Sequence, residues 1–354
     1  MKSAQVKQIG LEWMGRLGIF SACLEITKER TRILMYHRFT DKEMDEEKTP
    51  GRVFEEEICY AKERFRFMDM EEYLGRVKNG KEVPDKTAIV TVDDGYRDFY
   101  EIAYPVLRKH AVPATVFLTT DFIDGKGWLW IDIIRYALKE TTRDGLTIEI
   151  AGKTHELSIR DEKETRWASR TLGVACKTLS PQDRTATLEK LLEMLGVELP
   201  ARPTEDFAPL TWAQVIEMHR DGISFGAHTC SHPILTRVER DRALYEIAES
   251  KKRIEENLGR QVVSFCYPNG FEGDYDAELK RTVETEGFWG ATTAVYGMNG
   301  RGSDRYELRR IPAGYRQLVG FMADMSGFNE CRRFLRQSPF AKAGPRSGAR
   351  FPAS

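Results

Sequence analysis

The sequence has few features of a secreted, membrane-spanning or nucleic-acid-binding protein. Its six cysteines among 354 residues form no CxxC pair, and scattered cysteines in a chain of this length are typical of reduced, packed thiols in a cytosolic protein. Lys and Arg number 54 against 55 Asp and Glu, so we expect no bulk attraction to nucleic acid. No run of eighteen apolar residues occurs, which predicts that no segment spans a membrane.

The first thirty residues lack the uninterrupted apolar core of a signal peptide, because Glu12 and Arg16 fall inside the candidate stretch. We therefore expect a cytoplasmic protein. Apolar residues nevertheless recur there at helical spacing: Val6, Ile9, Trp13, Leu17 and Phe20. This pattern predicts an amphipathic helix within residues 1–30, packed on the domain surface. The alternative is a helix that lies on a membrane surface or against a partner enzyme.

Short apolar runs alternate with helical patterns in two parts of the chain. The runs predicted as strands are Ile33–His37, Thr87–Val92, Ala114–Thr119, Ile223–Ala227, Val262–Tyr267 and Ala291–Val295. The helical patterns between them are Phe99–Lys109, Arg240–Leu258 and Tyr275–Glu286. Strands that alternate with helices are typical of a parallel sheet. Their repetition over about 250 residues predicts an α/β fold built as a barrel or near-barrel.

The alternation lapses in the middle of the chain. Leu146–Ile150 and Thr154–Ile159 flank an Ala-Gly-Lys turn, which predicts a hairpin, and charged helical segments follow it. We interpret residues 121–209 as an insertion, a lid or side domain. Trp128 and Trp130 stand near its start, where core packing is the expected role and sugar stacking the alternative.

Two further boundaries follow from the composition. The barrel is predicted to comprise residues 31–120 and 210–337. Residues 338–354 are rich in Pro, Gly, Ser, Arg and Ala, which predicts a disordered tail.

Two adjacent acids, Asp93 and Asp94, follow the predicted strand Thr87–Val92. Parallel α/β folds place their chemistry at the C-terminal ends of strands, and Gly95 allows a sharp turn there. An acidic turn is the alternative interpretation, because Asp-Asp-Gly is common in turns.

Two of the six histidines, His228 and His232, follow the predicted strand Ile223–Ala227. Imidazole is a common metal ligand, and a carboxylate from Asp94 would complete a three-ligand site with open positions. We therefore predict one divalent metal ion, zinc first, with cobalt, nickel or iron compatible. Asp93 is then placed to act as the general base for a metal-activated water. Non-haem iron oxygenases use the same ligand set, but usually on antiparallel β-folds.

These two segments match a known family. Thr91–Gly95 (TVDDG) followed by His228–Pro233 (HTCSHP) resembles the NodB-type polysaccharide deacetylases, carbohydrate esterase family 4. The resemblance covers roughly residues 30–120 and 210–315. It implies a distorted β/α barrel, Asp93 as the base, and Asp94, His228 and His232 as the metal ligands.

The third motif of that family, Arg-x-Pro-Tyr, is altered here. Cys266 stands at the arginine position and Asn269 at the tyrosine position. In the family the backbone N–H at the latter position helps to stabilise the oxyanion, a role that Asn269 can keep. The arginine that braces the base is missing, and Arg309 or Arg310, expected on another strand, is a candidate replacement.

The family's catalytic acid, a histidine in a C-terminal motif, is also missing, since no histidine follows His232. The segment Leu34–Arg38 resembles the N-terminal motif of poly-N-acetylglucosamine deacetylases, whose motif order is circularly permuted. That resemblance implies His37 as the acid that protonates the leaving amine; a hydrogen-bonded strand-end residue is the alternative. The other histidines are expected to face solvent: His110, His155 and His219.

The sequence therefore predicts a metal-dependent hydrolase that removes an N-acetyl group from a glycan, a lipid-linked sugar or a nucleotide-linked sugar during glycan biosynthesis. Peripheral association with the inner membrane face or with a glycan-assembly enzyme is compatible with this function. A C–N hydrolase acting on a small non-peptide amide and a non-catalytic glycan-binding relative are the alternatives.

Overall fold

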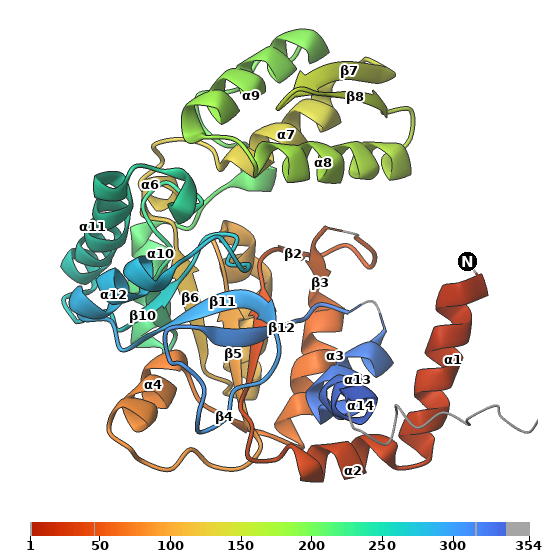
Figure 1. The fold of residues 1–354 in the computed structure, drawn as a ribbon, viewed down its shortest axis with the longest axis vertical. Coiled ribbons are helices and arrows are strands. Elements are labelled where there is room, and N and C mark those ends of the chain that lie inside the picture. The colour runs from red at the N-terminus through yellow and green to blue at the C-terminus, as the bar shows by residue number, and fades with distance from the viewer. Residues whose placement is uncertain (1, 46, 316, 338–354) are drawn as a thin grey trace, which may run out of the picture.

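A barrel of parallel strands forms the centre of the computed structural model, which describes residues 2–45, 47–315 and 317–337 (Figure 1). Within these residues, seven strands close the ring in chain order: β1 (Arg32–Tyr36), β5 (Thr87–Val92), β6 (Ala114–Leu118), β9 (Ser224–Ala227), β10 (Ser264–Cys266), β11 (Gly290–Tyr296) and β12 (Leu308–Pro312). The first strand, β1, pairs with both β5 and β12, which closes the barrel. The predicted α/β barrel is therefore confirmed.

Helices and short strands surround this ring. The helices are α3 (Gly51–Lys62), α4 (Met70–Lys78), α5 (Tyr104–His110), α10 (Trp212–Arg220), α11 (Arg240–Leu258) and α12 (Ala277–Thr285). The short strands are β2 (Phe39–Thr40), β3 (Thr49–Pro50) and β4 (Arg66–Phe67), of which β4 pairs with the start of β5. The helix predicted at Phe99–Lys109 begins as a π-helical turn over Phe99–Ala103.

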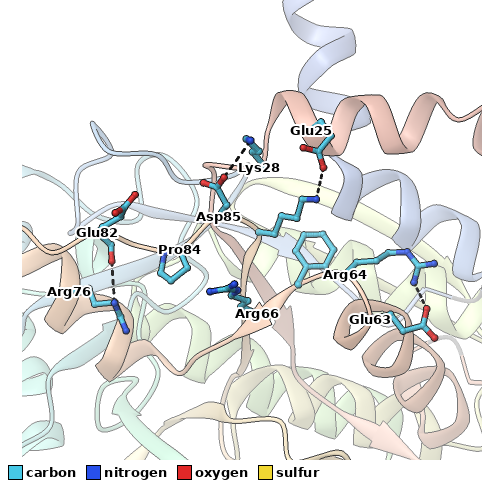
Figure 2. A pocket seen from close by; sticks show the side chains of 11 residues that line it. Glu25, Lys28, Glu63, Arg64, Arg66, Arg76, Glu82, Pro84 and Asp85 are labelled. Atoms are coloured by element: carbon cyan, nitrogen blue, oxygen red, sulfur yellow. Dashed lines mark hydrogen bonds and ion pairs between the residues drawn. The ribbon is translucent and has the colours of Figure 1, made fainter.

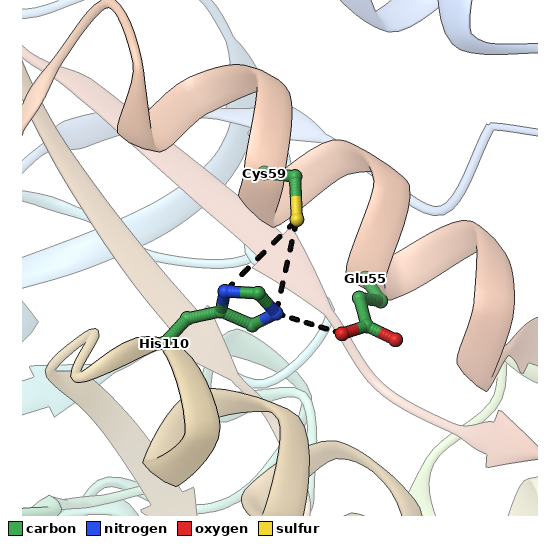
Figure 3. A group of neighbouring side chains, drawn as sticks. All are labelled: Glu55, Cys59 and His110. Carbon is green, nitrogen blue, oxygen red and sulfur yellow. Dashed lines mark hydrogen bonds and ion pairs between the residues drawn. The ribbon is translucent and has the colours of Figure 1, made fainter.

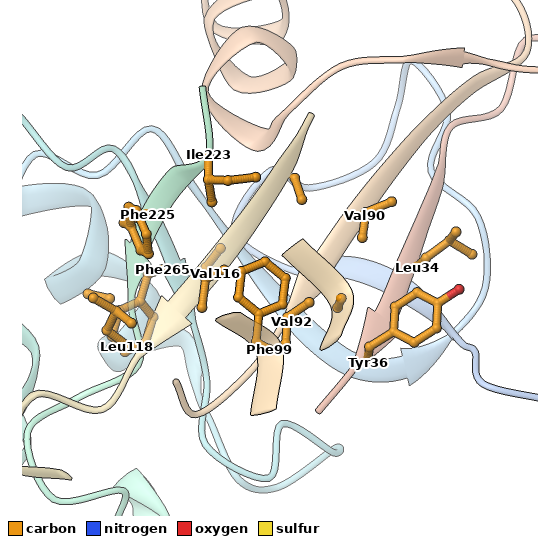
Figure 4. Packing of buried hydrophobic residues seen from close by; sticks show 14 of the residues in the cluster. Leu34, Tyr36, Val90, Val92, Phe99, Val116, Leu118, Ile223, Phe225 and Phe265 are labelled. Carbon is orange, nitrogen blue, oxygen red and sulfur yellow. The ribbon is translucent and has the colours of Figure 1, made fainter. Parts of the chain in front are cut away.

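The period of two along each strand decides which side chains line the barrel. An inner cluster includes Ile89, Phe117, Cys266 and Leu308, together with residues of α4. The intervening residues pack against the outer helices, among them Leu34, Val90, Val92, Val116 and Leu118 (Figure 4). Since residues 89 and 308 point inward, residues 91, 93 and 310 are expected to do so as well.

The middle of the chain leaves the barrel after β6 through α6 (Thr120–Ile123). It then forms α7 (Trp130–Glu140), β7 (Gly145–Ile150), β8 (Lys153–Ser158), α8 (Glu162–Cys176) and α9 (Pro181–Leu195). Strands β7 and β8 pair antiparallel where the sequence predicts a hairpin. These elements share a hydrophobic cluster of their own, including Ile134, Ile148, Leu172 and Leu191, and Figure 1 shows them as a separate layer above the barrel.

Both tryptophans near the start of this layer are half-buried and make packing contacts. Trp128 donates from Nε1 to the carbonyl of Pro200 at 2.8 Å and packs on the rings of Tyr136 and Phe207. The guanidinium of Arg184 lies 4.9 Å from the ring centroid of Trp130.

Terminal helices pack together beside the barrel: α1 (Lys2–Arg16), α2 (Ile19–Ile26), α13 (Leu318–Ser326) and α14 (Phe328–Gln337). The expected single N-terminal helix is in fact two helices, because the backbone breaks at Gly18, whose φ is 76°. After the break, Phe20 is buried against Phe328. The expectation that the whole apolar stripe packs on the domain is wrong for Ile9, Trp13 and Leu17, which are exposed.

Two sequence predictions concern features beyond this architecture. The predicted disordered tail, residues 338–354, lies outside the described residues. Among the helices of the described residues, none combines the length and the apolar character needed to cross a bilayer.

Candidate active site

Loops that follow the strands bring the predicted site residues to one end of the barrel. Asp93 and Asp94 directly follow β5, and His37 directly follows β1. His228 directly follows β9, with His232 four residues later. The structure thus gathers all five residues at the C-terminal ends of parallel strands, where such folds place their chemistry.

Asp94, His228 and His232 converge on one point. Oδ1 of Asp94 lies 3.6 Å from Nε2 of His228 and 3.4 Å from Nε2 of His232. The two Nε2 atoms are 3.2 Å apart. Metal bonds of about 2.0–2.1 Å at tetrahedral angles would separate neighbouring ligand atoms by about 3.4 Å. The three donor atoms therefore form a face into which a divalent metal fits.

The surroundings orient the two imidazoles. Nδ1 of His228 lies 2.7 Å from the carbonyl oxygen of Cys266, which can only accept, so Nδ1 carries the proton and Nε2 offers its lone pair to the site. Asp94 and His232 hold left-handed backbone angles, with φ of 75° and 57°. Such strain in residues other than glycine persists where the surrounding structure enforces it, often at functional sites.

The charge of the cluster favours a cation. Burial opposes a charge on His228, but Cys266 and the carboxylates of Asp93 and Asp94 raise its pKa to about 10. Burial and the neighbouring His228 lower the pKa of His232 well below its usual value. The surroundings thus favour protonation of one imidazole, but two adjacent imidazoles cannot both be protonated. A bound metal ion would supply the positive charge instead.

A buried ion pair holds Asp93. Nη1 and Nη2 of Arg310 each lie 2.7 Å from one carboxylate oxygen of Asp93, and both side chains are buried. Arg310 also donates from Nε to the carbonyl of Thr293 at 2.7 Å. Burial alone would raise the pKa of Asp93, but Arg310 and, more weakly, His37 hold it well below its usual range. Asp93 is therefore ionised at neutral pH.

Cys266 and Arg310 together account for the altered third motif. Sγ of Cys266 lies 3.7 Å from Oδ2 of Asp93 and 3.3 Å from Nη2 of Arg310. The small thiol leaves room for a guanidinium that arrives from β12. Strand alternation also explains why Arg310 and not Arg309 takes this place, since Arg310 shares the inward side with Leu308 while Arg309 is exposed.

His37 lies on the open side of Asp93. Its Nε2 is 3.6 Å from Oδ2 of Asp93, and its side chain is 47% exposed. An exposed imidazole next to a buried carboxylate can reach a substrate that enters from solvent and exchange protons with it.

The loop after β10 carries Asn269. Asn269 and Gly270 both have left-handed backbone angles, with φ of 61° and 67°. The Asn269 side-chain amide donates to the carboxylate of Asp274, which also accepts from the backbone N–H of Phe271 at 2.9 Å. Within the described residues, the Asn269 backbone N–H has no protein acceptor, so it can donate to a bound group.

The inserted layer borders this end of the barrel. Tyr96, two residues after Asp94, donates its hydroxyl to the buried Asp132 of this layer at 2.6 Å. The guanidinium of Arg38 lies over the ring of Tyr96, 4.0 Å from its centroid. Next to Arg38 lies a cleft of about 1050 Å³ between the layer and the barrel. Residues lining it include Arg38, Lys48, Arg135, Lys139, Arg160 and Phe207.

The remaining histidines, His110, His155 and His219, lie away from this site and are all half-buried. The prediction that they face solvent is wrong for His110 and His219, which contact protein groups. Nδ1 of His219 lies 3.2 Å from the carbonyl of Ile223. Nε2 of His110 lies 2.7 Å from Oε1 of Glu55 and 3.7 Å from Sγ of Cys59 (Figure 3). Although these three residues resemble a ligand set, Lys109 also donates to Oε1 of Glu55 at 2.7 Å, so the carboxylate already has a cationic partner.

A second cavity, of about 720 Å³, lies beside β4 and the residues that precede β5. Figure 2 shows ion pairs among its side chains, Lys28 with Asp85 and Arg64 with Glu63, and Lys86 pairs with Glu25. It lies at the N-terminal ends of the strands, opposite the candidate active site.

Comparison with known proteins agrees with this geometry. A family described as polysaccharide deacetylase matches residues 80–288. A poly-beta-1,6-N-acetyl-D-glucosamine N-deacetylase of Staphylococcus aureus is 31% identical over 125 residues, which cover 35% of this chain and 42% of that protein. The chain thus matches less than half of that relative. The Bacillus subtilis protein YxkH is 22% identical over 280 residues, covering 79% of this chain and 70% of YxkH.

Solved structures share the fold. IcaB from Ammonifex degensii superposes with a TM-score of 0.54 at 19% identity, covering 83% of this chain and 97% of that one. The Streptococcus pyogenes deacetylase PplD, solved in complex with acetate, gives a TM-score of 0.53 at 19% identity, covering 80% and 92%.

Proposed function

The chain belongs to the polysaccharide deacetylase family, and from this membership we propose that it is a metal-dependent hydrolase that removes N-acetyl groups from a glycan containing N-acetylglucosamine. The observation that carries the proposal is the ionised Asp93, braced by Arg310, beside the Asp94, His228 and His232 face. The name of the Staphylococcus aureus relative supports this choice of sugar.

We assign Asp94, His228 and His232 as the ligands of one divalent metal. Two neutral imidazoles and a carboxylate suit zinc best, and cobalt, nickel or iron are compatible. A metal bound there would supply Lewis-acid polarisation of the acetyl carbonyl and lower the pKa of water.

The chain's own groups would carry the protons. Asp93, ionised at neutral pH, accepts a proton from the attacking water. His37, exposed beside Asp93, protonates the departing amine nitrogen, which needs a donor to leave. The backbone N–H of Asn269 donates to the oxyanion of the tetrahedral intermediate. The products are acetate and a free amino sugar.

Acetate release tests the proposal. Wild-type protein loaded with zinc or cobalt would be assayed on N-acetylglucosamine oligomers, lipid-linked sugars and nucleotide sugars, with ammonia release from small amides in parallel. We expect acetate from an acetylated sugar. Ammonia alone would favour the small-amide hydrolase, and binding of oligomers without either product would favour a glycan-binding protein.

Asp93→Asn is the matched variant for this assay. We expect acetate release to fall by about a thousandfold, within the usual range for a general base, while metal content measured by elemental analysis stays at one ion per chain. A variant that kept near-wild-type turnover would remove Asp93 from the base role.

We also propose that the protein works in the cytoplasm. All six cysteines are unpaired thiols in the structure, and four of them are buried, as expected in a reducing compartment. Alkylation of the denatured protein straight after cell lysis should modify six thiols. A disulfide trapped at that step would contradict the proposed location.

A further inference from the structure

We propose that an exposed apolar stripe, formed by Ile9 and Trp13 on α1 and by Leu17 in the turn after it, docks onto an anionic membrane surface. This inference goes beyond the proposed reaction and depends on a different part of the molecule. Figure 1 places α1 at the outer margin, with α3, α13 and α14 between it and the barrel.

The three residues form one exposed apolar stripe. Their spacing of four residues keeps them on one side, since the Leu17 N–H still donates to the Trp13 carbonyl at 3.0 Å. Their exposed fractions are 50% for Ile9, 60% for Trp13 and 72% for Leu17. Ile26 on α2 and Phe334 on α14 are also exposed, at 76% and 77%. Single exposed apolar residues are ordinary, but three large ones on the same side of one segment indicate an interaction surface.

The opposite side of α1 already has its intramolecular partner. Gln317, at the start of α13, donates from its side chain to Gln8 at 2.6 Å, and Leu11 and Met14 are partly buried. The stripe is therefore not the core-facing side of a helix that has failed to dock. Its apolar area stays exposed after the helix has packed on its own chain.

The positive charge of the terminal helices favours an anionic partner. Residues 1–30 and 328–337 contain eight Lys and Arg against four Asp and Glu, whereas the chain as a whole has net charge −1. Arg16, Arg332 and Arg333 are exposed on these helices, and Glu12 is the acid on the exposed side of α1. A cationic helix with exposed Trp, Leu and Ile has the composition of an interfacial membrane helix. Two copies of the same cationic surface would repel each other, which disfavours self-association.

Vesicle flotation tests the inference without any enzyme assay, so its failure would leave the proposed hydrolase function untouched. Full-length protein would be mixed with vesicles of phosphatidylcholine alone or with 30% phosphatidylglycerol, a composition chosen for the assay. We expect binding to the anionic vesicles that weakens as salt is raised.

The test variant is Ile9→Ser/Trp13→Ser/Leu17→Ser. It should bind anionic vesicles at least tenfold more weakly than wild type, with unchanged circular dichroism. The matched control is Trp167→Ser/Val174→Ser, which removes apolar residues of α8 that are 57% and 67% exposed and should bind like wild type.

Three results would overturn the inference. One is wild-type binding by the triple variant, and another is equal loss in the α8 control. The third is that light scattering finds wild type as a dimer and the triple variant as a monomer, while neither protein binds vesicles. That result would assign the stripe to contact with a second copy of the chain.

Discussion

At the scale of single residues, the ion pair of Asp93 and Arg310 combines stability with the proposed chemistry. Two hydrogen bonds of 2.7 Å fix the carboxylate. Both side chains are buried, so water does not solvate either charge. Removing one partner of such a pair leaves a buried, unpaired charge, which is far more costly than removing both.

Arg310→Met should therefore lower the free energy of unfolding by about 3–5 kcal/mol, measured by urea titration. Asp93→Asn/Arg310→Met should recover a large part of that loss, because the buried charge is gone. Arg309→Met, on the exposed neighbour, is the control and should change stability by less than about 0.5 kcal/mol. A double variant as unstable as Arg310→Met would show that packing, not charge, gives Arg310 its effect.

At this scale the sequence predicted which residues form the site better than it predicted which residues they contact. The positions of Asp93, Asp94, His228 and His232 follow from motif and strand end, and the structure brings them together. The pairing of Asp93 with Arg310 joins residues 217 positions apart, and only the closed ring makes them neighbours. Two features of the sequence indicated this pairing: Cys266 at the arginine position of the third motif, and Arg309-Arg310 later in the chain. The choice between Arg309 and Arg310 required the register of β12.

At the scale of elements, the loop after β10 determines where the Asn269 N–H stands. Gly270 has φ of 67°, and a Cβ placed there would lie 2.8 Å from the Ala294 nitrogen and 2.9 Å from the Tyr267 oxygen. Gly273, in the same loop, has φ of 93° with open space around its Cβ position.

Gly270→Ala should therefore lower kcat about ten- to a hundredfold by displacing the oxyanion donor, with metal content unchanged. Gly273→Ala carries a similar backbone penalty without the steric clash and should keep most of the activity. Equal losses in steady-state assays of both variants would indicate general loop strain instead of a displaced donor.

Helix α3 is joined to the end of the barrel by Glu57, whose carboxylate accepts from Tyr36, Gly314 and Tyr315 at 2.7–3.0 Å. Burial raises the pKa of Glu57 to about 7 from a usual 4.5, although these donors favour the ionised form. The folded state then binds the proton more tightly than the unfolded state. Its stabilising effect is complete below about pH 4.5 and is lost as the pH rises through 7.

Glu57→Gln cannot ionise, so the difference in unfolding free energy between wild type and this variant should change with pH. We expect wild type to lose up to about 3 kcal/mol relative to Glu57→Gln between pH 4.5 and 8, measured by urea titration at several pH values. Glu56→Gln, on the exposed side of α3, should show no such trend. A flat difference for Glu57→Gln would mean that the three donors outweigh burial.

Sequence reasoning at this scale predicted the strands well and the terminal helices less well. Apolar runs predict buried strands because both faces of a parallel barrel are covered. Apolar periodicity does not show whether a helix packs its stripe on its own chain or exposes it. Ile9, Trp13 and Leu17 were for that reason predicted to be buried, whereas they are exposed.

At the scale of the whole molecule, the proposed metal should stabilise the fold as well as the reaction. A ligand that binds only the native state adds about 2.7 kcal/mol at a concentration of 100 Kd. Chelation should therefore lower the Tm, and returning zinc should restore it, as measured by calorimetry. The Tm of His232→Ala, which lacks a ligand, should respond far less to chelator. A Tm that chelation left unchanged, with metal shown to be removed, would contradict tight binding at this site.

The closure of β1 against β12 also has a consequence for the order of events during synthesis. The ribosome delivers His37 and Asp93 early, but Arg310 arrives only with the last strand of the ring. Until then Asp93 lacks the positive charge of Arg310, and the edge of β1 that pairs with β12 stays open. The barrel cannot complete itself from the N-terminal side, and we expect nascent chains that end before Leu308 to remain sensitive to protease while the finished chain resists it.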